Sequence, residues 1–207
     1  STTGNNSNPG TMAKPWLTWS YAFTSTLVNA GDTVYFRGGT YSITSGISMS
    51  RSGSAGNYIV YINYPGETPI LDGSGYSSSF NLMVTANAIS YVHMKGLTIQ
   101  NGITTANGAV GIRGMYLNHF ILENMTFAYI DGCGIYYTGS KYTETINCDA
   151  HDCFDKHSTH PGNWGVGFCV DTESSSDNDG KDYFTGCRAW NCSDQGFSCG
   201  NNYGYVE

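Results

Sequence analysis

Asp194, Gln195 and Ser198 bring three oxygen-bearing side chains together around Gly196-Phe197. Oxygen ligands suit calcium, which takes six or more of them and gains most of its binding energy from carboxylates. This stretch supplies one carboxylate, from Asp194, so it would hold the ion weakly. As a calcium site this stretch would be a weak one, and we predict no other cofactor.

Further acidic residues lie upstream, in or beside a stretch dense in Ser, Asp, Asn, His and Gly. They either swing back to complete the ligands or are solvated loop residues: Asp171, Asp177, Asp179 and Asp182. If a site here removed a proton from a substrate, it would also need a general base. The cations that could stand near such a site are expected at the surface, because long cationic side chains are mostly exposed: Lys156, Lys181 and Arg188.

Histidines and aspartates mix in the same region: His151, His157, His160, Asp149, Asp152 and Asp155. The mixture is either a transition-metal or acid/base site or the solvated chemistry of turns. We favour the second interpretation because no helix or strand fixes the ligand spacing. Paired carboxylates for glycoside hydrolysis depend on a spatial separation that sequence leaves open.

Flat aromatic faces are abundant, with 16 Tyr, 9 Phe and 4 Trp among few charged residues. Rings that point outward from a β-structure can stack on sugars, whereas rings that point inward build the core. The candidates for glycan stacking are Tyr136, Tyr137, Trp164, Trp190 and Tyr203.

The composition favours one elongated β domain, since 27 Gly and few charges are typical of many tight turns. A formal charge of -7 disfavours a nucleic-acid partner, which needs a basic footprint. No run of 18 apolar residues is present, so no membrane span is predicted. We expect a secreted protein, with candidate N-glycosylation sites at Asn5, Asn124 and Asn191.

Seven cysteines fall between Cys133 and Cys199 without a Cys-x-x-Cys pair, which disfavours a zinc site. Four tetrapeptides repeat one pattern at steps of 28, 23 and 39 residues and predict the same strand in successive coils: 96–99, 124–127, 147–150 and 186–189. Their second and fourth residues should point inward. Cys148 would then stack with Cys187, and Cys153 with Cys192, either as buried thiols or as disulfides between coils.

Before the repeat, residues 1–31 form a polar lead-in and a short capping helix over Trp19 to Asn29, capped by Thr18 and ended by Gly31. An apolar stripe of Ala22, Phe23, Leu27 and Val28 would face the solenoid. Residues 32–207 form the coils, with a loop insertion around 151–181. The chain is thus expected to be a single all-β solenoid domain over 1–207.

The sequence resembles the family-9 pectate lyases, which are right-handed parallel β-helix proteins, in segments spread over nearly the whole chain: 31–41, 58–67, 69–73, 167–168 and 183–198. The resemblance implies β-elimination of uronate polymers with calcium, and it places four Asp ligands at positions that here carry Asp194, Gln195, Ser198 and Val166. One carboxylate of the four is kept. The family's catalytic lysine lies a coil or more beyond this cluster, and no residue here matches it.

We therefore expect a right-handed parallel β-helix that acts as a non-catalytic glycan-binding or structural module with a degraded calcium site. Two alternatives stay open: a calcium-dependent lyase acting on uronate polymers, and an extracellular fibre subunit that stacks end to end. The expected partners are accordingly a polysaccharide or a second copy of the chain.

Overall fold

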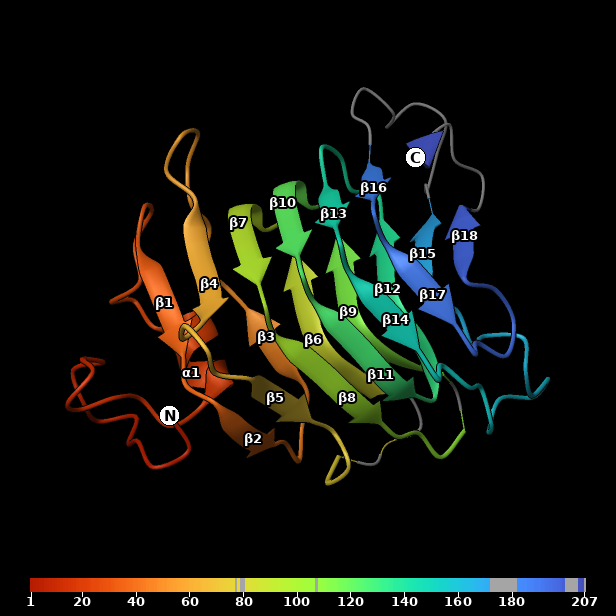
Figure 1. Ribbon diagram of the computed structural model, residues 1–207, viewed down its shortest axis with the longest axis horizontal. Helices are drawn as coiled ribbons and strands as arrows, with labels where there is room; N and C mark the ends of the chain where they lie inside the picture. Colours follow the sequence, from red (N-terminus) through yellow and green to blue (C-terminus); the bar gives the residue numbers. More distant parts are fainter. Residues whose placement is uncertain (77, 79–80, 107, 172–181, 200–204, 207) are drawn as a thin grey trace.

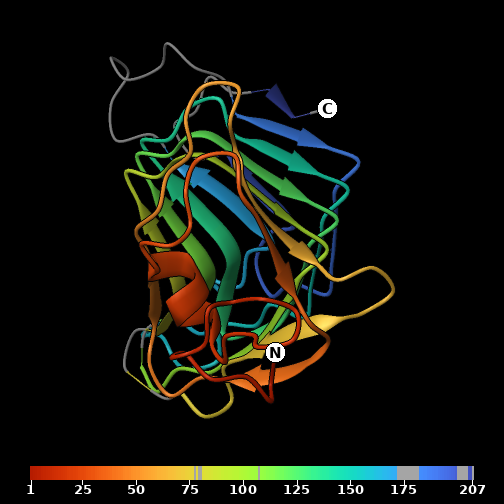
Figure 2. The ribbon, with the colours of Figure 1, turned by 90° about the vertical axis from the view of Figure 1, so that its left-hand side faces the viewer.

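The computed structural model describes residues 1–76, 78, 81–106, 108–171, 182–199 and 205–206. The chain winds through three parallel sheets, and each coil adds one strand to each sheet (Figure 1). Viewed from the N-terminal end, the strands of successive coils lie behind one another around a shared interior (Figure 2). The molecule is therefore a parallel β-helix.

Sheet A contains β1 (Thr33–Phe36), β4 (Ile59–Asn63), β7 (Ser90–Lys95), β10 (Asn118–Glu123), β13 (Glu144–Ile146), β16 (Tyr183–Thr185) and β19 (Tyr205–Val206). Sheet B contains β2 (Gly39–Ser42), β5 (Pro69–Asp72), β8 (Thr98–Gly102), β11 (Thr126–Ile130), β14 (Asp149–His151) and β17 (Arg188–Trp190). Sheet C contains β3 (Ile47–Met49), β6 (Asn81–Asn87), β9 (Ala109–Met115), β12 (Gly132–Thr138), β15 (Phe168–Asp171) and β18 (Phe197–Cys199).

The predicted repeat is confirmed at the corner between sheets A and B. Thr98, Thr126, Asp149 and Arg188 pair in register. The residue that opens each tetrapeptide has a positive φ: Gly96 (65°), Asn124 (52°), Asn147 (51°) and Gly186 (65°). Gly and Asn tolerate this left-handed backbone better than other residues, which is why they recur there.

The inward positions of the repeat fill the interior. Leu97, Ile99, Met125, Phe127, Cys148 and Ala150 are all fully buried. Their neighbours in the strands point outward, because side chains alternate along a strand. The hydrophobic core thus runs through the middle of the coils, and function has to be sought on their outer faces.

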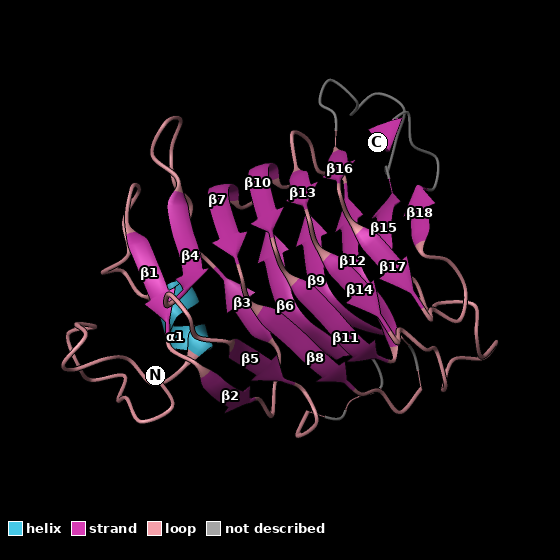
Figure 3. Cartoon of the chain, in the orientation of Figure 1, coloured by secondary structure: helices cyan, strands magenta, loops and turns pink. Residues whose placement is uncertain are grey.

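The capping helix α1 spans Trp19–Thr24, so it is shorter than predicted (Figure 3). Thr18 caps it as expected, since its hydroxyl accepts from the Tyr21 N–H. The helix stops because Ser25 takes an extended backbone, and Leu27 is consequently exposed rather than part of an apolar stripe. Trp19 and Phe23 are buried and cover the first coils.

The predicted insertion at 151–181 is not one loop, because β15 lies inside it. The strand is preceded by the connection 152–167. Asp177, Asp179 and Lys181 lie outside the described residues. No helix within the described residues is long and apolar enough to cross a membrane.

Candidate functional site on the outer face of sheet C

A second apolar cluster lies apart from the main core, on the outside of sheet C. Val110, Cys133 and Val166 are buried there, with Leu82 and Tyr136 packed against them. The members come from successive coils, since Leu82 pairs with Val110 and Val110 pairs with Cys133. They form an apolar floor that follows the long axis of the solenoid.

Beside this floor runs a polar column, also contributed by one residue per coil. Arg113 pairs with Tyr136, Tyr136 with Cys169, and Cys169 with Ser198. The guanidinium of Arg113 lies over the Tyr136 ring and donates to the Thr138 hydroxyl. A cation is therefore held on the outer surface at a fixed position.

Ionisation in this region is governed by burial. Burial raises the pKa of Cys133 to about 12 and that of Cys169 to about 11, so both stay neutral thiols near pH 7. Burial also raises the pKa of Tyr136, whose hydroxyl donates to Asp171. No thiolate nucleophile is thus expected at Cys133 or Cys169.

The connection 152–167 lies beside the apolar floor and forms one wall of a pocket described below. Hydrogen bonds hold it in place at several points. Asp155 is buried and accepts from the Ser158 N–H and hydroxyl. Ser193, from the next coil, accepts from the Asp155 N–H and donates to the Gly162 carbonyl. These bonds fix the connection to the next coil.

Trp164 stands at the end of this wall with its side chain half exposed. Its carbonyl accepts from the Cys133 thiol at 3.5 Å, which joins the wall to the floor. Between them lies a pocket of about 420 Å³, lined by Val110, Cys133, Tyr136, Ser158, Thr159 and Trp164. An aromatic face, an apolar floor and a few hydroxyls suit one face of a sugar ring.

Three of the four positions of the predicted calcium site lie side by side. The Asp194 N–H donates to the Gly165 carbonyl and the Gly167 N–H to the Gln195 carbonyl, so both residues lie beside Val166. Ser198 follows in the polar column. Val166 is only 5% exposed and packs in the apolar floor, and Asp194 is an exposed carboxylate.

Within the part of the chain that the structure describes, no group of three or more His, Cys, Asp or Glu side chains could hold a metal ion. The histidines of the mixed cluster are dispersed. His151 pairs with Asp152 and stacks on Trp190, whereas His157 lies 3.9 Å from Asp131.

The remaining acids and cations have other partners. Asp182 accepts from the N–H and hydroxyl of Thr143. Lys156 is exposed and pairs with Asp131 at 3.1 Å, and Arg188 is exposed and forms a bidentate pair with Asp149. These two cations are surface residues, as expected.

The five stacking candidates divide among different environments. Tyr136 and Trp164 line the pocket. The prediction for Tyr137 is wrong: its ring is fully buried, because alternation along β12 turns it into the core. Trp190 lies on sheet B, where His151 covers one face at 4.6 Å between ring centroids. Tyr203 lies outside the described residues.

The asparagines of the three sequons, Asn5, Asn124 and Asn191, are exposed. The side-chain amide of Asn191 donates to Asp152, and that of Asn124 to Glu123. Glycosylation at these positions stays a prediction.

Sequence reasoning missed Arg113. Arg113 and Tyr136 are 23 positions apart, whereas the same two coils are offset by 28 positions in sheet B, where Thr98 pairs with Thr126. The repeat step of the tetrapeptides would therefore not have placed Arg113 and Tyr136 in one column.

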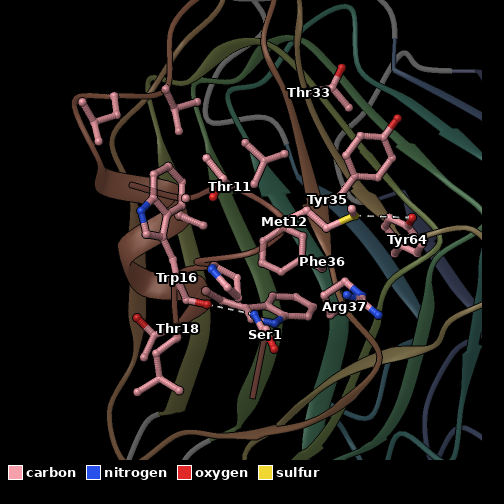
Figure 4. A pocket seen from close by; sticks show the side chains of 18 of the residues that line it. Ser1, Thr11, Met12, Trp16, Thr18, Thr33, Tyr35, Phe36, Arg37 and Tyr64 are labelled. Carbon is pink, nitrogen blue, oxygen red and sulfur yellow. Dashed lines mark hydrogen bonds between the residues drawn. The ribbon is translucent and has the colours of Figure 1, made fainter. Parts of the chain in front are cut away.

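Another cavity, of about 440 Å³, lies at the N-terminal end, between the lead-in segment and the first coil. Figure 4 shows Phe36 within it, with Met12 and Arg37 nearby. The Tyr64 hydroxyl donates to the Met12 sulfur, and Arg37 forms an ion pair with Glu67. The cavity is separate from the pocket on sheet C.

Stacked parallel coils joined through three parallel sheets define a parallel β-helix protein, and this one carries an aromatic-lined pocket on the outer face of sheet C. The chain belongs to the family described as Pel9A-like, right-handed β-helix region, whose model matches residues 1–207. The expected right-handed parallel β-helix and the resemblance to pectate lyases are thereby confirmed.

Pectate lyase L of Dickeya dadantii is 28% identical over 94% of this chain and 44% of its own length. A solved structure titled rhamnogalacturonan lyase superposes with a TM-score of 0.75 at 27% identity, over 95% of this chain and 52% of the other. Pectate lyase Pel9A superposes with a TM-score of 0.71 at 25% identity, over 99% and 50%. The chain thus spans about half the length of these relatives.

Proposed function

We propose that this chain is an extracellular module that binds acidic polysaccharide along the outer face of sheet C and does not use calcium to cleave it. The observation that carries the proposal is the burial of Val166 in the apolar floor. The resemblance to family-9 lyases assigns a carboxylate to this position. A valine side chain supplies no ligand, and the neighbouring Gln195 adds no charge.

The pocket and the polar column beside it supply contacts that suit such a polymer. Trp164 offers a half-exposed ring, and Arg113 holds a cation above Tyr136. Arginine recognises carboxylates through paired N–H donors, and a sugar face packs on an aromatic ring. The relatives are named as lyases of pectate and of rhamnogalacturonan, so we infer a uronate-containing chain as the ligand here.

The test combines a binding and a cleavage measurement on the purified chain. Affinity electrophoresis in gels with polygalacturonate should retard it, and Trp164→Ala should weaken the retardation. Trp190→Ala is the matched control, because that ring lies on sheet B. With calcium present, the absorbance of unsaturated products should stay flat.

An increase in absorbance would favour the alternative function, a calcium-dependent lyase. The exposed carboxylate of Asp194 is the observation that supports this alternative. Equal retardation of the Trp164 and Trp190 variants would instead show that the polysaccharide does not bind at Trp164 on the outer face of sheet C.

A further inference from the structure

Two pairs of cysteines stack in the interior between the last two complete coils. Asp149 pairs with Arg188, which places Cys148 beside Cys187 one position earlier. Cys148 is fully buried, and Cys187 packs against the core. The Cys187 thiol donates to the Thr145 carbonyl at 3.1 Å, so its sulfur reaches across to the preceding coil.

The second pair repeats this arrangement five positions further on. Cys153 is fully buried, Cys192 packs against the core, and the Ser193 N–H donates to the Cys153 carbonyl at 3.0 Å. In both pairs, the neighbouring thiol raises the pKa of the buried member, Cys148 or Cys153. The strand register and these backbone bonds place the two cysteines of each pair in neighbouring coils.

The geometry of adjacent coils is compatible with covalent linkage. Neighbouring parallel strands lie about 4.8 Å apart, within the Cα separation of about 4.4–6.8 Å that a disulfide requires. All seven cysteines are free thiols in the structure. Cys133 and Cys169 lie on the outer face of sheet C, in different columns, and Cys199 pairs with Val170. These three lack a stacked cysteine.

We propose that Cys148 with Cys187, and Cys153 with Cys192, are two disulfide sites that fasten one coil to the next. In each, one S–S bond replaces two S–H bonds. The two electrons and two protons pass to a low-molecular-weight disulfide such as glutathione disulfide, which becomes two thiols. The two cysteines of each link are 39 positions apart in the sequence, as are Asp149 and Arg188.

Such links restrict the unfolded chain and so stabilise the coil that carries Asp194, Gln195 and Ser198. They also fit an oxidising compartment, where structural disulfides persist. The inference is independent of polysaccharide binding.

The test is disulfide mapping of the purified, folded chain. The folded protein is equilibrated with oxidised glutathione, the remaining thiols are then alkylated with a maleimide in denaturant at mildly acidic pH, and peptides are analysed without reduction. We expect links 148–187 and 153–192, with Cys133 and Cys169 alkylated. The melting temperature should exceed that of the reduced protein by roughly 5 °C or more.

Cys187→Ser should abolish the first link, leave Cys148 alkylated and preserve the second link. Cys169→Ser, the matched control, should retain both. Alkylation of all four interior cysteines, or links within one coil such as 148–153, would overturn the proposal. Because the mapping is decisive on the unaltered chain, a variant that fails to fold leaves the test intact.

Discussion

The guanidinium of Arg113 lies over the ring of Tyr136, with its central carbon 4.0 Å from the ring centroid. The two residues belong to neighbouring strands of sheet C and pair in register. Stacking on the ring and donation to Thr138 hold the cation in one place. A carboxylate on a bound polymer would meet a charge that is already oriented.

Arg113→Ala should weaken polygalacturonate binding about tenfold or more, since a hydrogen bond to a charged group contributes about 1.5–3 kcal/mol. Affinity electrophoresis or calorimetry measures the loss. The matched control is Arg188→Ala, because Arg188 also lies near an aromatic ring but on sheet B. Equal losses for the two variants would contradict a role for this column.

Calcium should bind the unmodified chain with a Kd of about 1 mM or weaker, because Val166, Gln195 and Ser198 carry no charge. Calorimetric titration gives the value. Replacing all three residues by Asp should create a tighter site beside Asp194. Micromolar calcium binding by the unmodified chain would favour the calcium-dependent lyase over the non-catalytic binding module.

Cys148→Asp should unfold the protein or lower its free energy of unfolding by several kcal/mol. The Cys148 side chain is fully buried, and an unpaired buried carboxylate costs as much as a small domain's whole stability. Thermal unfolding followed by circular dichroism measures this. Cys199→Asp, at an exposed position, should melt close to the unaltered chain. A normal melt for Cys148→Asp would mean that this column is not interior.

Asp182 should make the protein less stable as the pH rises from about 4 to about 6. Burial raises its pKa to about 6 in the folded state, against the opposing hydrogen bonds from Thr143. As the pH rises through this window, the Asp182 carboxyl loses its proton in the unfolded chain before it does so in the folded protein, which favours the unfolded state. Below about pH 4 the carboxyl is protonated in both states, so it does not affect stability there.

Asp182→Asn should flatten this part of the pH profile and raise the free energy of unfolding at pH 7 by on the order of 1–3 kcal/mol. Urea unfolding at pH 4 and pH 7 measures both effects. A parallel pH profile for the variant would show that Asp182 is ionised throughout.

The amino-acid sequence by itself determined the coil register. Gly96, Asn124, Asn147 and Gly186 mark one corner of successive coils, because only residues that tolerate a positive φ suit it. Alternation along the strand then fixed which neighbours point inward, including Cys148. These features depend on local backbone geometry, which a short stretch of sequence encodes.

Only the tertiary structure decided which outward residues share a surface. Arg113 and Tyr136 lie 23 positions apart on different strands, yet they form one column on the outer face of sheet C. The connection 152–167 brings Trp164 over Cys133 through bonds to another coil, and Val166 joins an apolar floor built from three strands. Contacts between residues tens of positions apart depend on how the coils stack and where each connection folds back, and no local pattern specifies that.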